Sequence, residues 1–115
     1  MKLGEILRIV EGKLITNEAD LDAEIRCACG ADLMSDVLTH SRPGALLLTG
    51  LTNPQVVRTA EVADIAAIVF VRGKMPPPET IALALEKGIP VITAPYTMFE
   101  LCGRLYKAGM ASCDL

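Results

Sequence analysis

The sequence has few aromatic residues: two Tyr, two Phe and no Trp among 115 residues. Its hydrophobic content of 51% is still enough for a core, which must therefore be built from aliphatic side chains. The length fits one domain of ordinary size. The mean hydropathy of +0.41 is high for so small a chain. We therefore expect part of the apolar surface to be covered by a second copy, most simply in a two-fold homodimer.

The sequence also lacks a long apolar run. No stretch approaches the roughly 18 residues that a membrane-spanning helix needs. Glu5, Arg8 and Glu11 interrupt the apolar pattern of the N-terminal segment, which has no signal-peptide cleavage site. These absences predict a cytoplasmic protein that does not associate with membranes. In that reducing compartment we expect free thiols rather than disulfides at all four cysteines, namely Cys27, Cys29, Cys102 and Cys113.

A cluster of basic residues is missing as well. The formal net charge is −3 and the isoelectric point is about 5.1. Lys and Arg are scattered along the chain, and Arg72 and Lys74 form their closest group in the second half. Because proteins that bind nucleic acids usually present a basic face, the sequence argues against DNA or RNA as a partner.

Motifs that carry known chemistry are absent too. The chain contains no Gly-x-Gly-x-x-Gly or Walker A phosphate loop and no Gly-x-Ser-x-Gly nucleophile turn. Its single histidine, His40, falls near the end of a predicted helix, where a cation is favourable. No partner for acid–base work can be named for it. The sequence therefore predicts no catalytic residue and no cofactor.

What the sequence does contain is a set of three short apolar runs: Ala45–Thr49, Ala67–Val71 and Ile89–Thr93. Each run is followed by a polar or proline-marked turn and then by an amphipathic helical pattern, which indicates strand–loop–helix units. Crossovers between parallel strands are right-handed. The pattern predicts an α/β fold with a small, mostly parallel sheet flanked by helices, in a single domain over residues 1–115.

Local signals mark where the helices begin. Asp32 stands where the N-cap of a helix is needed. Asn53 is a good N-cap, and Pro54 suits the first helical position. Thr97 and Glu100 form the Thr-x-x-Glu pattern of a capping box. We expect helices to start at each of these three places.

The first third of the chain is less regular. Apolar residues at helical spacing predict a helix over Leu3–Val10, with Gly12 as its C-terminal cap. Lys13–Thr16 is predicted to form a brief strand. The alternation of apolar and polar residues over Ala23–Cys27 predicts a half-buried strand at the edge of the sheet, which Gly30 ends.

Cys27 and Cys29 are one residue apart, so in a strand both thiols would lie on one face. Zinc and iron–sulfur sites usually use Cys-x-x-Cys pairs and four ligands. Cys102 and His40 would complete a set of four ligands only if the fold placed them beside Cys27 and Cys29. Because a buried free cysteine is commonly just a small apolar residue, we predict no metal site. A small redox or metal-binding protein that uses Cys27 and Cys29 stays as the alternative.

The ends of the three strands are the better candidates for a binding site. Ligands of open α/β sheets bind beyond the carboxyl ends of the strands, and helix N-termini favour anions. In the competing interpretation these residues are only caps and turn formers. We predict that a small anionic ligand binds at six residues: Thr52, Asn53, Arg72, Lys74, Tyr96 and Thr97.

Four segments of the sequence are GADLMSDVL at 30–38, AIVFVRG at 67–73, EKGIPV at 86–91 and FELCGRLY at 99–106. In their order and spacing, these segments resemble the DRTGG domain family over nearly the whole chain, from about Leu3 to Gly109. The name-giving Asp-Arg-Thr-Gly-Gly stretch is absent, and its nearest counterpart is Ile25–Gly30, which keeps an Arg and a final Gly.

This resemblance implies a regulatory or ligand-binding module rather than an enzyme, since the family offers no catalytic residues to carry over. Its members are often appended to catalytic domains, including phosphate acetyltransferase-like proteins and CBS-domain pyrophosphatases. Stand-alone members occur, some beside iron-only hydrogenase genes. The Ser41–Gly44 turn and Leu48–Gly50 are similar to the non-catalytic N-terminal domain of HPr kinase/phosphorylase. The resemblance therefore implies a sensor of a nucleotide or phosphorylated metabolite, or a module that binds a partner protein.

Overall fold

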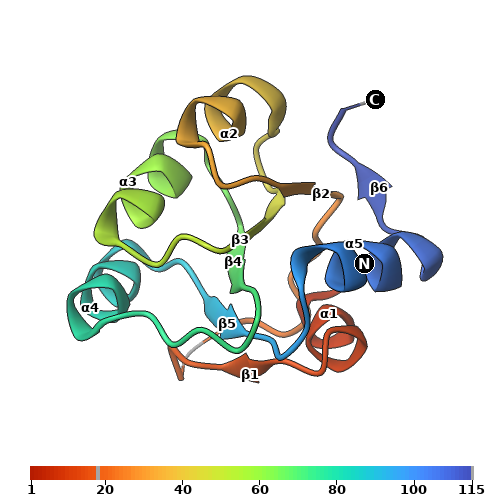
Figure 1. Ribbon diagram of the computed structural model, residues 1–115, viewed down its shortest axis with the longest axis horizontal. Helices are drawn as coiled ribbons and strands as arrows, with labels where there is room; N and C mark the ends of the chain where they lie inside the picture. The colour runs from red at the N-terminus through yellow and green to blue at the C-terminus, as the bar shows by residue number, and fades with distance from the viewer. Residues whose placement is uncertain (18, 115) are drawn as a thin grey trace.

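A computed structural model describes residues 1–17 and 19–114. Within these residues the helices alternate with short strands along the chain (Figure 1). The helices are α1 (Leu3–Ile9), α2 (Met34–His40), α3 (Pro54–Val62), α4 (Pro78–Lys87) and α5 (Met98–Lys107). The strands are β1 (Lys13–Leu14), β2 (Cys27–Gly30), β3 (Leu46–Thr49), β4 (Ala67–Phe70), β5 (Val91–Thr93) and β6 (Ala111–Ser112).

The strands form one sheet in the order β1-β5-β4-β3-β2-β6. β2, β3, β4 and β5 run parallel to one another, β6 runs parallel to β2, and β1 is antiparallel to β5. The α/β fold with a mostly parallel sheet is therefore confirmed. No helix within the described residues is long and apolar enough to cross a bilayer.

The sheet separates two layers of helices (Figure 1). α2, α3 and α4 lie side by side on one face, and α1 and α5 lie together on the other. Because side chains of a strand alternate between faces, each central strand feeds both cores. Ile68 and Phe70 of β4 pack under the first layer, whereas Val69 of the same strand packs under the second. The strands are buried on both sides, which explains why they read as continuous apolar runs.

The helix starts predicted at Asn53 and Thr97 are confirmed. α3 begins at Pro54 directly after Asn53, and α5 begins directly after Thr97, whose hydroxyl accepts a hydrogen bond from the Glu100 N–H at 3.4 Å. α4 ends at Gly88, which adopts the left-handed conformation with φ of 67°. Glycine adopts that conformation without strain, so these boundaries follow from local chemistry.

The strand predicted over Ala23–Cys27 is wrong in its position, because the sheet strand is β2 at Cys27–Gly30. Residues 23–25 are extended, but their partners are the first residues of the chain. The Leu3 N–H donates to the Ala23 carbonyl at 3.0 Å, and the Ile25 N–H donates to the Met1 carbonyl at 2.8 Å. The alternating pattern thus reflects pairing with the N-terminus. β2 is also not the sheet edge, because β6, which the sequence did not predict, lies outside it.

Gly12 caps α1 through its N–H, which donates to the Leu7 carbonyl at 2.9 Å, but it is not the left-handed residue at the end of the helix. Glu11 is the residue in the left-handed region, with φ of 52°. Gly12 instead passes close to β5, where an added Cβ would lie 2.5 Å from Cγ2 of Ile92. The glycine is needed for close approach of the chain to the sheet rather than for a left-handed turn.

Candidate functional site

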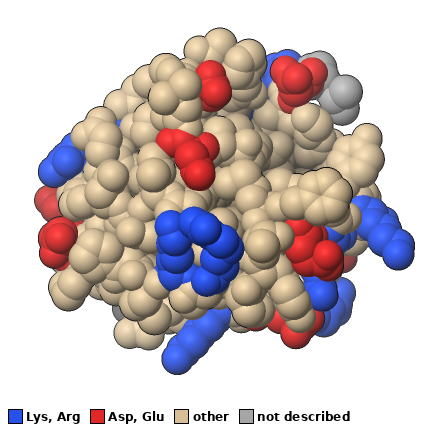
Figure 2. Space-filling view, in the orientation of Figure 1, with Lys and Arg blue, Asp and Glu red and all other residues tan. Residues whose placement is uncertain are grey.

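The carboxyl ends of β2, β3, β4 and β5 meet along one edge of the sheet, because these strands are parallel. The loops that follow them lie at this edge and lead into α2, α3, α4 and α5. Figure 2 shows Lys and Arg side chains gathered near the middle of this face, over the ends of β4 and β5, with acidic side chains beside them. The edge therefore carries charges of both signs.

Gly50, the buried residue after β3, stands at the centre of these charges. Oδ1 of Asp32 accepts hydrogen bonds from the Gly50 N–H at 2.7 Å and from the Thr49 hydroxyl at 3.0 Å. The Lys74 ammonium donates to the Gly50 carbonyl at 2.8 Å. A Cβ added at Gly50 would lie 3.4 Å from Asp32 Oδ2 and 3.5 Å from Arg72 Nη2. We call Asp32, Thr49, Gly50, Arg72 and Lys74 the Gly50 cluster.

The Gly50 cluster combines two cations with one carboxylate. Asp32 and Arg72 are exposed to solvent, whereas Lys74 is half-buried. The Lys74 ammonium has further N–H donors beyond the one that it gives to the Gly50 carbonyl. The arrangement can therefore attract an anion with Arg72 and Lys74 while Asp32 accepts hydrogen bonds from an uncharged part of the same molecule.

The backbone of the β4–α4 loop fixes where these cations lie. Arg72 adopts the left-handed conformation with φ of 61°, which is uncommon for a residue other than glycine. Its N–H donates to the Tyr96 carbonyl at 2.7 Å, and the Gly73 N–H donates to the Ala94 carbonyl at 2.7 Å. The Thr93 hydroxyl donates a hydrogen bond to the Lys74 carbonyl at 2.8 Å. The loop is thus fastened to the end of β5, and the strained Arg72 conformation is held by these bonds.

Asp32 does not cap α2, contrary to the sequence-based prediction. The N-cap of α2 is Leu33, which makes no side-chain capping bond. The Asp32 carboxylate is instead used by the end of β3, as described above. The residues around Asp32 look the same whether it caps a helix or accepts hydrogen bonds from a distant segment. Its role as an acceptor becomes visible only through the parallel pairing of β2 with β3.

Thr52 and Asn53 lie at the start of α3, on the same edge. Asn53 occupies the N-cap position with extended backbone, and its side chain makes no capping hydrogen bond. The Thr52 carbonyl accepts a hydrogen bond from the buried Thr80 hydroxyl of α4 at 2.7 Å. The first turn of α3 leaves N–H groups without intrahelical partners, which favours negative charge there.

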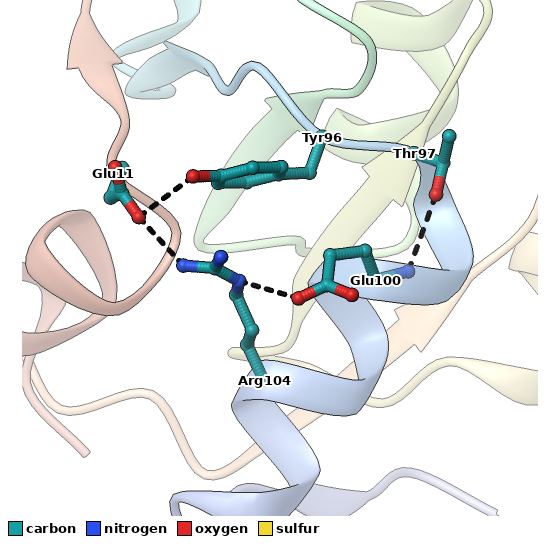
Figure 3. Close-up of polar contacts among 5 residues, drawn as sticks. All are labelled: Glu11, Tyr96, Thr97, Glu100 and Arg104. Atoms are coloured by element: carbon teal, nitrogen blue, oxygen red, sulfur yellow. Dashed lines mark hydrogen bonds and ion pairs between the residues drawn. The ribbon is translucent and has the colours of Figure 1, made fainter.

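Tyr96 and Thr97 belong to a different group of contacts (Figure 3). The Tyr96 hydroxyl donates to Oε2 of Glu11 at 2.9 Å, and the Arg104 guanidinium lies 3.9 Å from the centre of the Tyr96 ring. Arg104 also donates to Glu11 at 2.7 Å and to Glu100 at 2.8 Å. The Tyr96 side chain therefore joins the end of α1 to α5. The structure brings Arg72 and Lys74 together, but not with the side chains of Tyr96 and Thr97.

These contacts shift the pKa values of Glu11 and Arg104. The hydrogen bonds from Arg104 and then from Tyr96 lower the pKa of Glu11 below its ordinary value of 4.5. The hydrogen bonds to Glu100 and then to Glu11 raise the pKa of Arg104. Both shifts favour the charged forms, as expected for opposite charges in direct contact.

The cysteines differ from the prediction of four free thiols. Cys27 of β2 is joined to Cys113, after β6, by a disulfide, while Cys29 and Cys102 are free. Burial raises the pKa of both free thiols. Cys27 and Cys29 therefore do not pair with each other. No group of three metal-ligating side chains occurs in the described part of the chain.

A separate hollow lies between α5 and the β2–β6 side of the sheet. It measures about 420 Å³ and is mainly apolar. Phe99, Cys102, Tyr106 and Met110 are among its lining residues. Sequence reasoning did not single out this groove, although the apolar Phe99 and Tyr106 on the outer side of a predicted helix were a signal for it.

Comparison with known proteins agrees with this architecture. No curated protein matches the chain. Among solved structures it is similar to the CBS and DRTGG domains of the regulatory region of Clostridium perfringens pyrophosphatase, crystallised with the activator diadenosine tetraphosphate. The TM-score is 0.72 at 18% identity, and the match covers 98% of this chain. The chain thus spans about half of that neighbour, at 48% of its length.

The family model for the DRTGG domain matches residues 5–108, which is most of the chain. The match includes β2 to β5, all of the Gly50 cluster and the whole of α5. The stretch that gives the family its name is nevertheless not present in this sequence. On the extent of the match, the chain belongs to the DRTGG domain family.

Proposed function

We propose that residues 1–115 form one non-enzymatic regulatory domain that binds a small anionic ligand at the Gly50 cluster and acts as a homodimer. The observation that carries this proposal is the meeting of Arg72, Lys74 and Asp32 around Gly50 at the carboxyl edge of the sheet. Ligands of open α/β sheets bind at this edge. A cytoplasmic location, expected from the sequence, is part of the same proposal.

The charges in the Gly50 cluster favour a ligand with two different parts. A phosphate would meet Arg72 and Lys74 and lie near the start of α3, where Thr52 and Asn53 stand. A hydroxyl or amino group would donate to Asp32. A nucleotide or a phosphorylated metabolite has both features, whereas inorganic phosphate has only the first. The backbone at Tyr96 and Thr97 would border the bound ligand, since the Tyr96 carbonyl accepts a hydrogen bond from the Arg72 N–H.

Two observations support regulation rather than catalysis. DRTGG domains occur in the regulatory region of a pyrophosphatase that was crystallised with a dinucleotide activator. The Gly50 cluster itself contains no cysteine or histidine, and its carboxylate already accepts two hydrogen bonds. The cluster is therefore suited to hold a ligand rather than to transfer a proton or act as a nucleophile. A bound ligand would change how this domain meets a partner protein.

Titration calorimetry with AMP, ATP, diadenosine tetraphosphate and inorganic phosphate tests the proposal. We expect at least one nucleotide to bind more tightly than phosphate, and Arg72→Gln with Lys74→Met to weaken that binding by at least tenfold. A ligand at one hundred times its dissociation constant should also stabilise the fold by about 2.7 kcal/mol. Arg58→Gln, which removes a charge from the exposed side of α3, is the matched control and should bind normally.

Two results would contradict the proposal. The first is that none of these probes binds. The second is that a nucleotide binds the Arg72 and Lys74 double variant as tightly as the wild type, because the ligand would then use another site.

A further inference from the structure

The outer side of α5 is unusual for a surface helix. Leu101 and Leu105 are buried against the sheet, and at 100° per residue Gly103 points almost directly away from them. Next to it on one side stand Phe99, which is 89% exposed, and Tyr106, which is 73% exposed. Two aromatic side chains on one exposed helix face form a patch of the kind that marks interaction sites.

Gly103 makes a hollow in this surface. Apart from its chain neighbours and the backbone of its own helix, no heavy atom lies within 4 Å of a Cβ added at Gly103. The hollow measures about 450 Å³, and Phe99 and Lys107 line it together with Gly103. A protruding aromatic ring and an empty hollow thus lie one helical turn apart on the same helix. A second copy of the helix can therefore approach closely at Gly103, with Phe99 beside the contact.

We propose that a second copy of this chain docks here, with α5 packed antiparallel on α5 across a two-fold axis at Gly103. The inference rests on the homodimer of the proposed function and adds the surface that forms it. The missing side chain at Gly103 allows the two helix backbones to approach closely.

Symmetry decides the orientation of the two helices. In an antiparallel pair the two-fold axis is perpendicular to α5. The side of one helix that carries Phe99 and Tyr106 therefore faces the same side of its copy. With a rise of about 1.5 Å per residue, Phe99 lies about 6 Å before Gly103 and Tyr106 about 4.5 Å after it. Phe99 of one copy therefore faces Tyr106 of the other. Aromatic pairs of this kind are favourable beyond the area that they bury.

The charged residues on the other side of Gly103 match in the same way. Glu100 lies about 4.5 Å before Gly103 and Lys107 about 6 Å after it, so the antiparallel contact brings opposite charges together. Lys107 makes no ion pair among residues 1–17 and 19–114. The Glu100 side chain remains 50% exposed although it accepts a bond from Arg104. A parallel contact would instead set Phe99 against Glu100.

The neighbouring apolar groove extends the contact surface. Its lining includes Phe99, Gly103 and Tyr106, and it continues to Met110 beside β6. One pair of helices buries less than the roughly 1,200–2,000 Å² of a stable interface, so we expect the groove to contribute. α5 lies on the outside of its layer, at the right of Figure 1, where a second copy has access.

Light scattering over a concentration series is the first test. We expect the wild type to dimerise and Phe99→Glu to raise the dissociation constant of the dimer at least tenfold. The matched control is Val62→Glu on α3, because Val62 is 76% exposed on the opposite layer and should leave dimerisation unchanged. Circular dichroism verifies that both variants stay folded.

Cross-linking tests the axis itself. In a background with Cys29→Ser and Cys102→Ala, Gly103→Cys should form a disulfide-linked dimer on mild oxidation, whereas Val62→Cys should stay monomeric on a non-reducing gel. Lys107→Glu and Glu100→Lys should each weaken self-association, and their mixture should form heterodimers because every facing pair then has opposite charges.

The outcomes separate this inference from the proposed function. A protein that remains monomeric at all concentrations overturns both the homodimer and this surface, while nucleotide binding at the Gly50 cluster can still hold. A dimer that survives Phe99→Glu and that Gly103→Cys does not cross-link overturns the surface alone.

Discussion

Single residues in this molecule carry contacts that their immediate neighbours in the sequence do not reveal. Asp32 is the clearest case, because its carboxylate satisfies the N–H of buried Gly50 and the hydroxyl of buried Thr49. A buried donor that loses its acceptor destabilises the fold by about 1–3 kcal/mol. Asp32 therefore supports the fold of the edge at which we place the ligand.

We expect Asp32→Ala to lower the free energy of unfolding by about 1–3 kcal/mol, since the Gly50 N–H would lose its acceptor. Urea unfolding followed by circular dichroism measures this. Glu86→Ala, which removes a carboxylate from an exposed position of α4, should change stability by less than about 0.5 kcal/mol. Equal effects of the two substitutions would show that the hydrogen bonds of Asp32 do not matter.

Cys27 and Cys113 form the second residue-scale contact that the sequence did not predict. They are 86 residues apart, so no local spacing relates them. A cross-link of this span restricts the unfolded chain, and its loss typically destabilises a domain by about 2–4 kcal/mol. Disulfides in the cytoplasm are usually transient. If the protein resides there, we expect this bond to form and break with the redox state.

Reduction should therefore lower the free energy of unfolding of the wild type by about 2–4 kcal/mol. The Cys27→Ser and Cys113→Ser double variant is the control, because reductant should not change its stability. Thiol titration of the unfolded, unreduced wild type should detect only Cys29 and Cys102. Four reactive thiols without reductant would contradict the disulfide.

At the scale of helices and strands, α1 and α5 are joined by the contacts of Glu11 (Figure 3). A carboxyl group whose pKa is lowered in the folded state stabilises that state when it is charged. This stabilisation is present above the ordinary pKa of 4.5 and is lost as the pH falls through the lower value of the folded protein.

The thermal unfolding midpoint of the wild type should accordingly exceed that of Glu11→Gln at pH 7, and the gap should close as the pH falls below the ordinary pKa of 4.5. Differential scanning calorimetry at several pH values measures both midpoints. Arg104 stays charged throughout this range, so it does not complicate the comparison. A gap that is independent of pH would contradict an electrostatic role of Glu11.

The helices and strands that were predicted correctly are those whose signals lie within a few residues of the sequence. β3, β4 and β5 are continuous apolar runs, and α3 and α5 start after Asn53 and Thr97, so each is encoded within a few residues. β2 was misplaced because the partner of residues 23–25 is the distant N-terminus. Arg72 and Lys74, two of the predicted site residues, follow one strand and lie close together for that reason. Asp32 was predicted only as a helix cap, and it reaches them through the parallel register of β2 and β3.

The whole molecule is two helical layers separated by a sheet, and the proposed ligand edge and dimer surface belong to different parts of it. The Gly50 cluster lies at the end of the strands, and α5 lies on the layer opposite α3. The two variants that test these sites, at Arg72 and at Phe99, are therefore independent in their direct contacts. Their effects on ligand affinity and on dimerisation can be combined in a double-mutant cycle.

Tyr96 is the residue at which these two regions touch. Its carbonyl receives the N–H of Arg72, while its ring lies under Arg104 of α5. A displacement of the loop by an incoming phosphate would either pull this tyrosine along or break the 2.7 Å hydrogen bond that ties it to Arg72. If the bond holds, the position of one ring would transmit occupancy of the proposed ligand site to the helix where two subunits would meet.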